Sequence, residues 1–550
     1  MKVNIKGGGP VTLNTNHFIA KGGEGSVYGK GDLVYKVTEP GKMIPSDKIR
    51  ELSILTHPDI IIPKDILLDS KNNEVGYTMR WVKDTCTLCE LFTQTFKDDH
   101  HIDSDTIIGL VKKLQELVTH THSKSILIVD LNELNFLVNN VYDRVFAIDV
   151  NSYQTKSYKA TAIMESIRDI HSKTFNQETD WFSWGVVTCQ MLTNIHPYKG
   201  THPNYKGKSS VRFQARRQNN ISIFDSSVTL PAVATIDTIP NTLKEWYKAI
   251  FQDGKRCLPP TNFEVSVPII PKPTITQLQS TSFILTELLS VDEGEEIVGC
   301  RLYKKNYLIL TKNFIYYNKE KFSRPNTKVE ILFTHNNADP ISVYCKNNIL
   351  YIYNYRMKEL ISSPINFSYI NTYNGRLFGI QGTTIAEITI NKKLVSFKPV
   401  GNVLNIPHAI QVFPGMIVQN MLGRLYATPL DTLQPIPLDV LKDYKIIDGR
   451  YKNGLFVTIG HKDGRYDRFL IDKGGGYIKF EDITTAGINM NVSEGGVLVL
   501  INEEDKIEMA RGTMNVKIAK DNLIDNSFRL FSCDFIAVIR GNKVFQLSTK

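Results

Sequence analysis

Two neighbouring stretches of sequence decide the fold: His122-Ser-Lys-Ser-Ile-Leu-Ile-Val-Asp130-Leu-Asn-Glu-Leu-Asn135-Phe-Leu-Val138 and Phe146-Ala-Ile-Asp149-Val-Asn-Ser-Tyr-Gln154. Short apolar runs typical of strands alternate in them with acidic residues and an asparagine. Phosphoryl transfer to a hydroxyl needs such a set, because one carboxylate must orient the hydroxyl while an amide oxygen and a second carboxylate hold Mg²⁺. Asp130, Asn135 and Asp149 are therefore the candidate reactive and metal-binding groups.

The segment before these stretches carries a glycine-rich turn and a lysine on a strand. Phe18-Ile-Ala-Lys-Gly22-Gly23-Glu24-Gly25-Ser26-Val27-Tyr28 has few side chains at its centre, so backbone amides can approach a phosphate there. Leu33-Val-Tyr-Lys36-Val37 then places a lysine in an apolar strand, 94 residues before Asp130. Taken alone, each signal is equally typical of a hairpin turn or a surface lysine.

Together these motifs resemble the catalytic core of the eukaryote-like (Hanks-type) protein kinases, whose catalytic loop reads H-R-D-L-x-x-x-N and whose metal acid opens D-F-G. The resemblance covers residues 15–262 and implies an α+β two-lobed fold that uses ATP and Mg²⁺. It assigns Asp130, Lys36 and Asn135 to catalysis and Asn135 and Asp149 to the metal ion. The residues that it implies for the nucleotide site are Ala20, which replaces the first usual glycine, Gly22, Gly23, Glu24, Gly25, Ser26, Val27, Lys36, Glu51, Met79 and Trp81.

Several of these assignments come with an expected contact. In the family, a helix glutamate pairs with the strand lysine, and Glu51 is the candidate partner of Lys36. The hinge that would meet the adenine edge falls at residues 79–82, with Met79 as the gatekeeper.

The same resemblance extends into the larger lobe. Glu178-Thr-Asp180-Trp-Phe-Ser-Trp-Gly185 matches the segment that opens a long helix, where the aspartate ties back to the catalytic-loop backbone. Glu165 stands for the A-P-E glutamate, and its expected partner is Arg256.

Two departures from the family pattern carry information. Ile128-Val129 stand where regulated kinases have His-Arg, and loss of that arginine argues against switching by phosphorylation of the activation loop. Residues 149–154 are close to the D-x-D-S-F-Q variant of a bacterial and phage branch, whose catalytic loop commonly reads G-D-x-N-x-x-N. The resemblance thus implies a cytoplasmic enzyme of a bacterial cell or a phage-infected host.

The second half of the chain differs from the first in its pattern of apolar and turn residues. Between Leu258 and Thr276 lie five prolines, which predict a semi-rigid linker. Beyond them, β-branched and aromatic runs alternate with turn residues in hairpin-like units that recur, with one exception, about every 40 residues. These units begin near Lys305, Lys346, Asn374, Pro414, Asn453, Glu494 and Cys533. The spacing predicts an all-β propeller of seven blades, with six blades or a pair of β-sandwiches as the alternatives.

The sequence therefore predicts four regions. They are an N-lobe at 12–82, a C-lobe at 83–262, a proline-rich linker at 263–280 and a propeller-like domain at 281–550.

Composition limits the function classes. The net charge of +9 comes without a dense Lys/Arg run, which disfavours nucleic acid as a partner. Seven scattered cysteines disfavour a disulfide framework and fit a reducing cytoplasm. The sequence has no apolar run approaching the 18 or so residues of a membrane helix.

These features favour an ATP-dependent protein kinase that phosphorylates a Ser/Thr hydroxyl of a protein, with the propeller recruiting the partner. The alternative is a pseudokinase scaffold that binds nucleotide without turnover. A propeller that covers and inhibits the kinase also fits the sequence.

Overall fold

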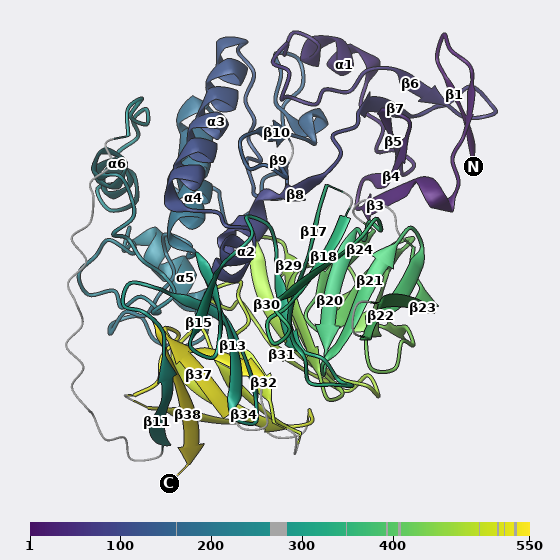
Figure 1. Ribbon diagram of the computed structural model, residues 1–550. Helices are drawn as coiled ribbons and strands as arrows, with labels where there is room; N and C mark the ends of the chain where they lie inside the picture. The colour runs from purple at the N-terminus through teal and green to yellow at the C-terminus, as the bar shows by residue number, and fades with distance from the viewer. Residues whose placement is uncertain are drawn as a thin grey trace.

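The computed structural model describes residues 1–160, 162–263, 283–347, 349–391, 394–404, 409–493, 496–513, 516–521, 523–532 and 536–549. In Figure 1 the first half of the chain, with the helices, lies above a β part that carries the green and yellow strands. Of the expected linker at 263–280, all but Phe263 lies outside the described residues. Among the described residues, the structure contains no helix that is both long and apolar enough to span a bilayer.

A seven-stranded sheet forms the N-terminal lobe, in the order β2-β1-β6-β7-β5-β4-β3. Its strands are β1 (Lys2–Ile5), β2 (Pro10–Thr12), β3 (Phe18–Gly22), β4 (Gly25–Lys30), β5 (Leu33–Thr38), β6 (Ile66–Leu68) and β7 (Glu74–Arg80). Lys30 pairs with Leu33, so β4 and β5 are joined by a two-residue turn whose Gly31 has φ +63°. The lobe also carries η1 (Thr15–His17) and the short helix α1 (Ser46–Leu52).

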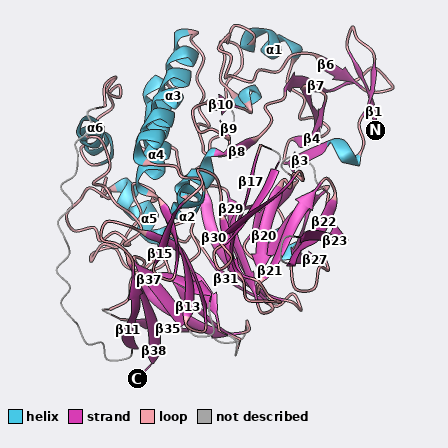
Figure 2. Cartoon of the chain, in the orientation of Figure 1, coloured by secondary structure: helices cyan, strands magenta, loops and turns pink. Residues whose placement is uncertain are grey.

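The second lobe is mainly helical. Its elements are β8 (Thr85–Thr87), η2 (Leu88–Phe92), α2 (Gln94–Asp99), α3 (Ser104–Ser123), β9 (Phe136–Asn139), β10 (Val145–Ala147), η3 (Val150–Ser152), α4 (Gln177–Thr193), α5 (Ser209–Gln218) and α6 (Asn241–Phe251). The Asp103 side chain caps α3 by accepting from the Thr106 amide at 2.8 Å. Helix α4 contains residues 178–185, the segment expected to open a long helix, and Figure 2 shows α3 beside α4.

Seven antiparallel sheets of four strands each make up the described part of the second half. The first three contain β12 (Ile297–Tyr303), β13 (Asn306–Thr311), β14 (Phe314–Tyr317) and β15 (Glu320–Ser323); β16 (Glu330–Phe333), β17 (Pro340–Lys346), β18 (Ile349–Asn354) and β19 (Glu359–Ser363); and β20 (Tyr369–Tyr373), β21 (Arg376–Gln381), β22 (Thr384–Asn391) and β23 (Leu394–Asn402). The next three contain β24 (Ile410–Phe413), β25 (Met416–Met421), β26 (Arg424–Pro429) and β27 (Ile436–Pro437), followed by η4 (Asp439–Leu441); β28 (Lys445–Lys452), β29 (Leu455–Lys462), β30 (Arg465–Asp472) and β31 (Tyr477–Phe480); and β32 (Met490–Val492), β33 (Val497–Ile501), β34 (Lys506–Arg511) and β35 (Val516–Lys520).

The last sheet joins the two ends of this region. Its order is β11 (Phe283–Ser290), β38 (Lys543–Thr549), β37 (Ile536–Arg540) and β36 (Arg529–Ser532). Phe283 lies opposite Thr549, so the first strand of the region pairs with the last one. This pairing closes the series of sheets.

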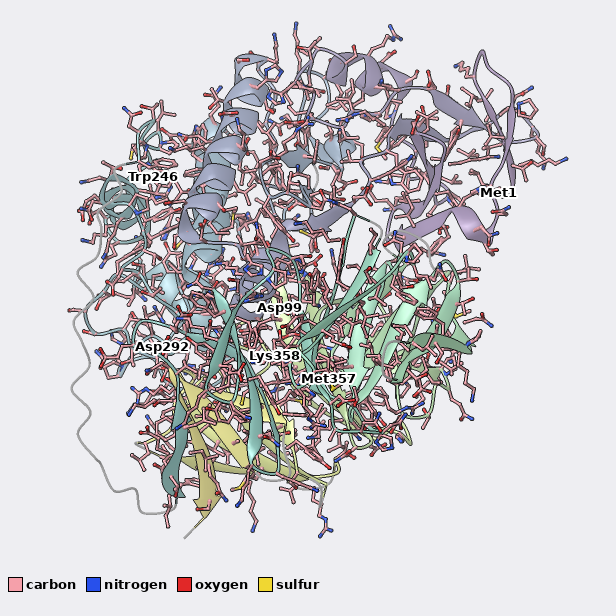
Figure 3. The ribbon with its side chains drawn as sticks, in the orientation of Figure 1. Met1, Asp99, Trp246, Asp292, Met357 and Lys358 are labelled. Carbon is pink, nitrogen blue, oxygen red and sulfur yellow. The ribbon has the colours of Figure 1, made fainter. Side chains whose placement is uncertain are left out.

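One hydrophobic core runs through both halves of the molecule. The same cluster of buried side chains contains Leu114 of α3 and Trp184 of α4 together with Val457 and Ile459 of β29. Asp99, at the end of α2, lies where the helical lobe meets the β part (Figure 3). The two halves are therefore packed as one body, and the face of the helical lobe towards the β part is covered.

Candidate active site

Lys36 lies at the centre of a charged cluster between the two lobes. Its side chain is buried on β5, and its Nζ donates to Asp149 Oδ1 at 2.7 Å, Glu24 Oε2 at 2.6 Å and Asn151 Oδ1 at 3.3 Å. Burial alone would lower the pKa of Lys36, but the field of Asp149, Tyr77 and Glu24 outweighs it and holds the pKa above its usual value. The lysine stays charged, and 113 residues of chain fold back to bring Asp149 to it.

The glycine-rich turn joins β3 to β4 above this lysine. A Cβ atom added at Gly22 or Gly23 would meet nothing within 4 Å, so packing does not require glycine at these two positions. Gly25 is different, because a Cβ there would lie 2.2 Å from the carbonyl oxygen of Val37. The tip therefore has room for a group to approach the backbone, while Gly25 lets β4 lie against β5.

The loop of residues 128–135, which corresponds to the catalytic loop of the resemblance, is held in place by hydrogen bonds to α4. The Asp180 carboxylate accepts the backbone N–H groups of Ile128 and Val129, both at 2.8 Å, as the sequence predicted. It also lies 2.9 Å from His122 Nε2. Val129 has φ +62°, which costs a β-branched residue about 1–3 kcal/mol. The buried aspartate holds this strained peptide immediately before Asp130.

Asp130 and Asn135 lie at the two ends of this loop. Asn135 Nδ2 donates to the backbone oxygen of Asp130 at 3.0 Å, and Asp130 Oδ1 accepts the Met164 amide at 2.8 Å. The Asn135 carbonyl accepts from the Ile148 amide at 2.9 Å, which places Asp149 next to the loop. Burial raises the pKa of Asp130 above its ordinary value. A carboxylate with a raised pKa is a better proton acceptor.

A cavity of about 3030 Å³ opens beside these groups and extends over the β part. Of the residues predicted for the nucleotide, metal and catalytic sites, its described wall contains Ala20, Gly22, Gly23, Glu24, Gly25, Val27, Lys36, Met79, Trp81, Asn135 and Asp149. Ser26, Glu51 and Asp130 are not in that described wall. Apolar side chains next to the charged cluster include Ile19, Val34, Leu137 and Ile148. This combination of an apolar wall and a charged end suits a base joined to phosphates.

Met79 and Trp81 come from the last strand of the small lobe and the residues after it. Met79 pairs with Val34 on β5. The Trp81 amide donates to the Asp32 carbonyl at 2.9 Å, and a Cβ added at Gly29 would lie 2.6 Å from the Trp81 ring. The Trp81 ring thus packs on Gly29, and its backbone N–H is used within the protein.

The expected pair between Lys36 and Glu51 is not formed in the described structure. Glu51 Oε2 instead accepts the Ser157 amide at 3.2 Å, and Glu24 of the glycine-rich turn takes the place beside Lys36. Lys48 is the buried charged residue of α1. Burial lowers the pKa of Lys48, while Glu24, Asp149 and Glu51 oppose that shift. No local pattern in the sequence indicates this exchange, because Glu24 belongs to a turn rather than to the helix.

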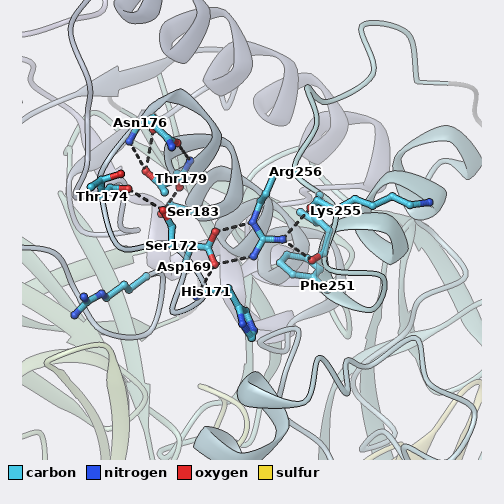
Figure 4. A network of polar contacts seen from close by, with 12 residues as sticks. Asp169, His171, Ser172, Thr174, Asn176, Thr179, Ser183, Phe251, Lys255 and Arg256 are labelled. Carbon is cyan, nitrogen blue, oxygen red and sulfur yellow. Dashed lines mark hydrogen bonds and ion pairs between the residues drawn. The ribbon is translucent and has the colours of Figure 1, made fainter.

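The expected pair between Glu165 and Arg256 is also replaced. Arg256 donates from Nε and Nη2 to the two carboxylate oxygens of Asp169, at 2.6 and 2.7 Å (Figure 4). Glu165 instead accepts from Arg217 Nη1 at 3.1 Å. The two acids are four residues apart in an irregular segment, where spacing does not reveal which of them meets the arginine.

Asn135 and Asp149 present side-chain oxygens of the kind that could hold Mg²⁺. Asn135 uses its amide nitrogen on Asp130, so its amide oxygen is the atom that would serve a metal ion together with the Asp149 carboxylate. Both are hard oxygen donors of the kind that Mg²⁺ takes alongside phosphate oxygens. The described residues contain no cluster of three or more His, Cys, Asp or Glu side chains that could hold a metal ion by itself.

No family model matches the chain. A stretch of 111 residues, 19% of the chain, is 24% identical to a probable serine/threonine-protein kinase of Dictyostelium discoideum, and covers 8% of that protein. Among solved structures, the Cydia pomonella granulovirus kinase matches 43% of the chain and 87% of its own, at 15% identity and a TM-score of 0.32. The sequence match supports a protein-kinase-like relationship for this chain.

Proposed function

We propose that this protein is an ATP-dependent protein kinase that transfers the γ-phosphoryl group to a Ser/Thr hydroxyl of a protein. The observation that carries the proposal is the meeting of Lys36, Asp149 and Asn135 on one cavity wall under an open glycine-rich turn. The resemblance of residues 149–154 to a bacterial and phage branch supports a bacterial or phage-infected cytoplasm as its setting.

The chain's own groups divide the work between them. Mg·ATP, when bound, would supply the transferable phosphoryl group. Lys36 supplies a fixed positive charge for phosphate oxygens, and the Gly22–Gly23 backbone has room to approach them. Asn135 and Asp149 offer oxygen ligands to the metal. Asp130, held by the Met164 amide, orients the acceptor hydroxyl and receives its proton.

The β part is proposed to be a seven-bladed propeller that recruits the protein partner. Its sheets follow one another along the chain, and the first strands of successive sheets contact each other in the series β12–β16–β20–β24–β28. Strand β36 contacts both β32 and β12, and β11 pairs with β38. A series of sheets whose first strands contact one another, with the first and last strands of the region paired, is typical of propellers and supports this proposal.

The test is transfer of labelled phosphate from γ-labelled ATP to a mixture of Ser/Thr peptides. Lys36→Met and Asp130→Asn should each reduce the rate at least about 100-fold. The matched control is Lys30→Met, which removes an exposed lysine of the same hairpin that bonds to the Thr12 carbonyl. Transfer by either site variant at the wild-type rate would contradict the assignment.

The second candidate is a pseudokinase scaffold. It is favoured by the Lys36–Glu24 contact, which places a carboxylate where phosphates would lie, and by Asp149-Val150-Asn151 in place of D-F-G. A thermal-shift titration with Mg·ATP followed by an autophosphorylation assay separates the two. Binding without any turnover supports the scaffold.

A further inference from the structure

The β29–β30 hairpin reaches the catalytic loop from more than 300 residues away. Glu133 lies between Asp130 and Asn135, and its Oε1 accepts from the Tyr466 hydroxyl of β30 at 3.0 Å. His461 Nε2 of β29 lies 3.0 Å from the same oxygen. All three side chains are buried.

This contact joins the middle of the loop to the β part inside the protein. The Tyr466 hydroxyl gives the buried Glu133 carboxylate a hydrogen-bond donor. Separating the two would leave a buried polar group without that partner, which is costly. The middle of the catalytic loop is therefore anchored to the β part.

The tip of the same hairpin touches the second segment that holds Asp130. Asp463 and Gly464 form the turn, with φ values of +51° and +74°. A Cβ added at Gly464 would lie 2.3 Å from Ser166 Oγ and 2.9 Å from Met164 Cγ. Met164 is the residue whose amide donates to Asp130 Oδ1. One hairpin thus supports the loop that carries Asp130 and the segment that caps its carboxylate.

The hairpin is part of a permanent interface. Lys199 of the helical lobe donates to Asp482 Oδ1 at 2.8 Å, and both side chains are buried. Val457 and Ile459 of β29 belong to the core that also contains α3 and α4. Moving the hairpin away would expose this apolar surface and leave buried charges without partners. This argues against a β part that opens and closes over the helical lobe.

We propose that His461 and Tyr466 are positioning residues: through Glu133 they hold the catalytic loop, and with it Asp130, in the geometry needed for phosphoryl transfer. The β part then does in a fixed way what a phosphorylated activation loop does in regulated kinases. This inference rests on the proposed function, because it assigns a role within that reaction.

The experiment compares two tyrosines of the β part in the full-length protein. Tyr466→Phe removes the donor to Glu133, and Tyr451→Phe removes an equivalent donor to Asp431 at 2.6 Å, away from the catalytic loop. For Tyr466→Phe we expect kcat for peptide phosphorylation to fall at least tenfold while the KM for ATP changes less than twofold. Tyr451→Phe should change neither. Equal losses in both variants, no loss, or a faster rate in Tyr466→Phe would overturn the proposal.

A second pair of variants tests the hairpin tip. Gly464→Ala should lower kcat because the added methyl group presses on Met164 and Ser166. The control Gly454→Ala has a similar φ of +86° in the neighbouring hairpin, but the nearest atom to its Cβ would be Lys473 Cε, at 3.5 Å on a flexible side chain. A loss confined to Gly464→Ala supports the proposal, and equal effects of the two substitutions contradict it.

Amide hydrogen exchange separates this inference from the proposed function. If the wild-type protein transfers no phosphate, the proposed function fails, yet the anchoring can still be measured. Exchange of the amides of residues 131–135 should be at least tenfold faster in Tyr466→Phe than in Tyr451→Phe. Equal exchange in the two variants would overturn the anchoring itself.

Discussion

The polar groups around Lys36 and those around Glu133 belong to the same candidate site but differ in their exposure to solvent. The two acids that pair with Lys36 keep 49% and 34% of their side chains exposed, at Glu24 and Asp149. Glu133 and His461 are 2% and 0% exposed. The exposed acids beside Lys36 can be replaced as its partners by the oxygens of a ligand. The buried contact of Glu133 with His461 is closed to solvent and can only hold the two segments together. The first cluster, which we call the open side, is suited to binding, and the second, the sealed side, to support.

The largest effect should come from breaking the buried ion pair between Lys199 and Asp482, which lies in the same sealed interface as Glu133. Lys199→Met leaves the buried Asp482 without its partner and should lower the free energy of unfolding by about 3–5 kcal/mol, measured by urea denaturation of the whole chain. The double variant Lys199→Met/Asp482→Asn should recover most of the loss. As a control, Lys113→Met removes an exposed pair with Glu116 and should cost under about 1 kcal/mol. Equal costs at Lys199 and Lys113 would show that the interface is not sealed.

A smaller effect is expected on the open side. Glu24→Gln removes a negative charge that competes with phosphates for Lys36, and should tighten Mg·ATP binding by up to about fivefold in calorimetry. Glu39→Gln, which loses an exposed pair with Lys21, should leave the affinity unchanged. Weaker binding by Glu24→Gln would mean that Glu24 orients Lys36 for the nucleotide instead of competing with it.

The smallest effect concerns Asp130, which lies between the two clusters. Its pKa is raised in the folded protein, so this carboxyl favours folding below the unfolded-state pKa, about 3.9, and loses that contribution as pH rises through the folded value. Asp130→Asn should therefore be more stable than wild type at pH 7, by no more than about 1 kcal/mol. Unfolding free energies measured from pH 3 to 7 should converge at the acid end. A gap that widens towards acid would contradict the raised pKa.

Local patterns in the sequence predicted the elements well. Residues 178–185 open a long helix as their motif implies, and the strands of the second half follow the recurring hairpin-like units. The tie from Asp180 to the backbone before Asp130 also followed from a motif. In these cases the deciding residues are close in sequence or belong to one recurring pattern.

Pairings between distant acids and bases were beyond the sequence. Glu24 replaces Glu51 beside Lys36, and Asp169 replaces Glu165 beside Arg256, because the irregular backbone decides which of several nearby acids reaches the base. The contact of Glu133 with His461 joins two structural regions and leaves no periodic signal in either. Such contacts depend on how the halves dock, which no local pattern records.

The pairing of β11 with β38 has a consequence for synthesis on the ribosome. Of the four strands in the last sheet, β11 leaves the ribosome first, and it cannot pair until residues 543–549 have followed. At 5–20 residues per second, this leaves roughly 10–50 s during which one edge of β11 lacks its partner. Over the same interval the apolar face of the helical lobe stays exposed, because the strands that cover it have not all been made. Until then the nascent chain exposes an unpaired strand edge, the feature through which unfinished chains pair with one another and aggregate.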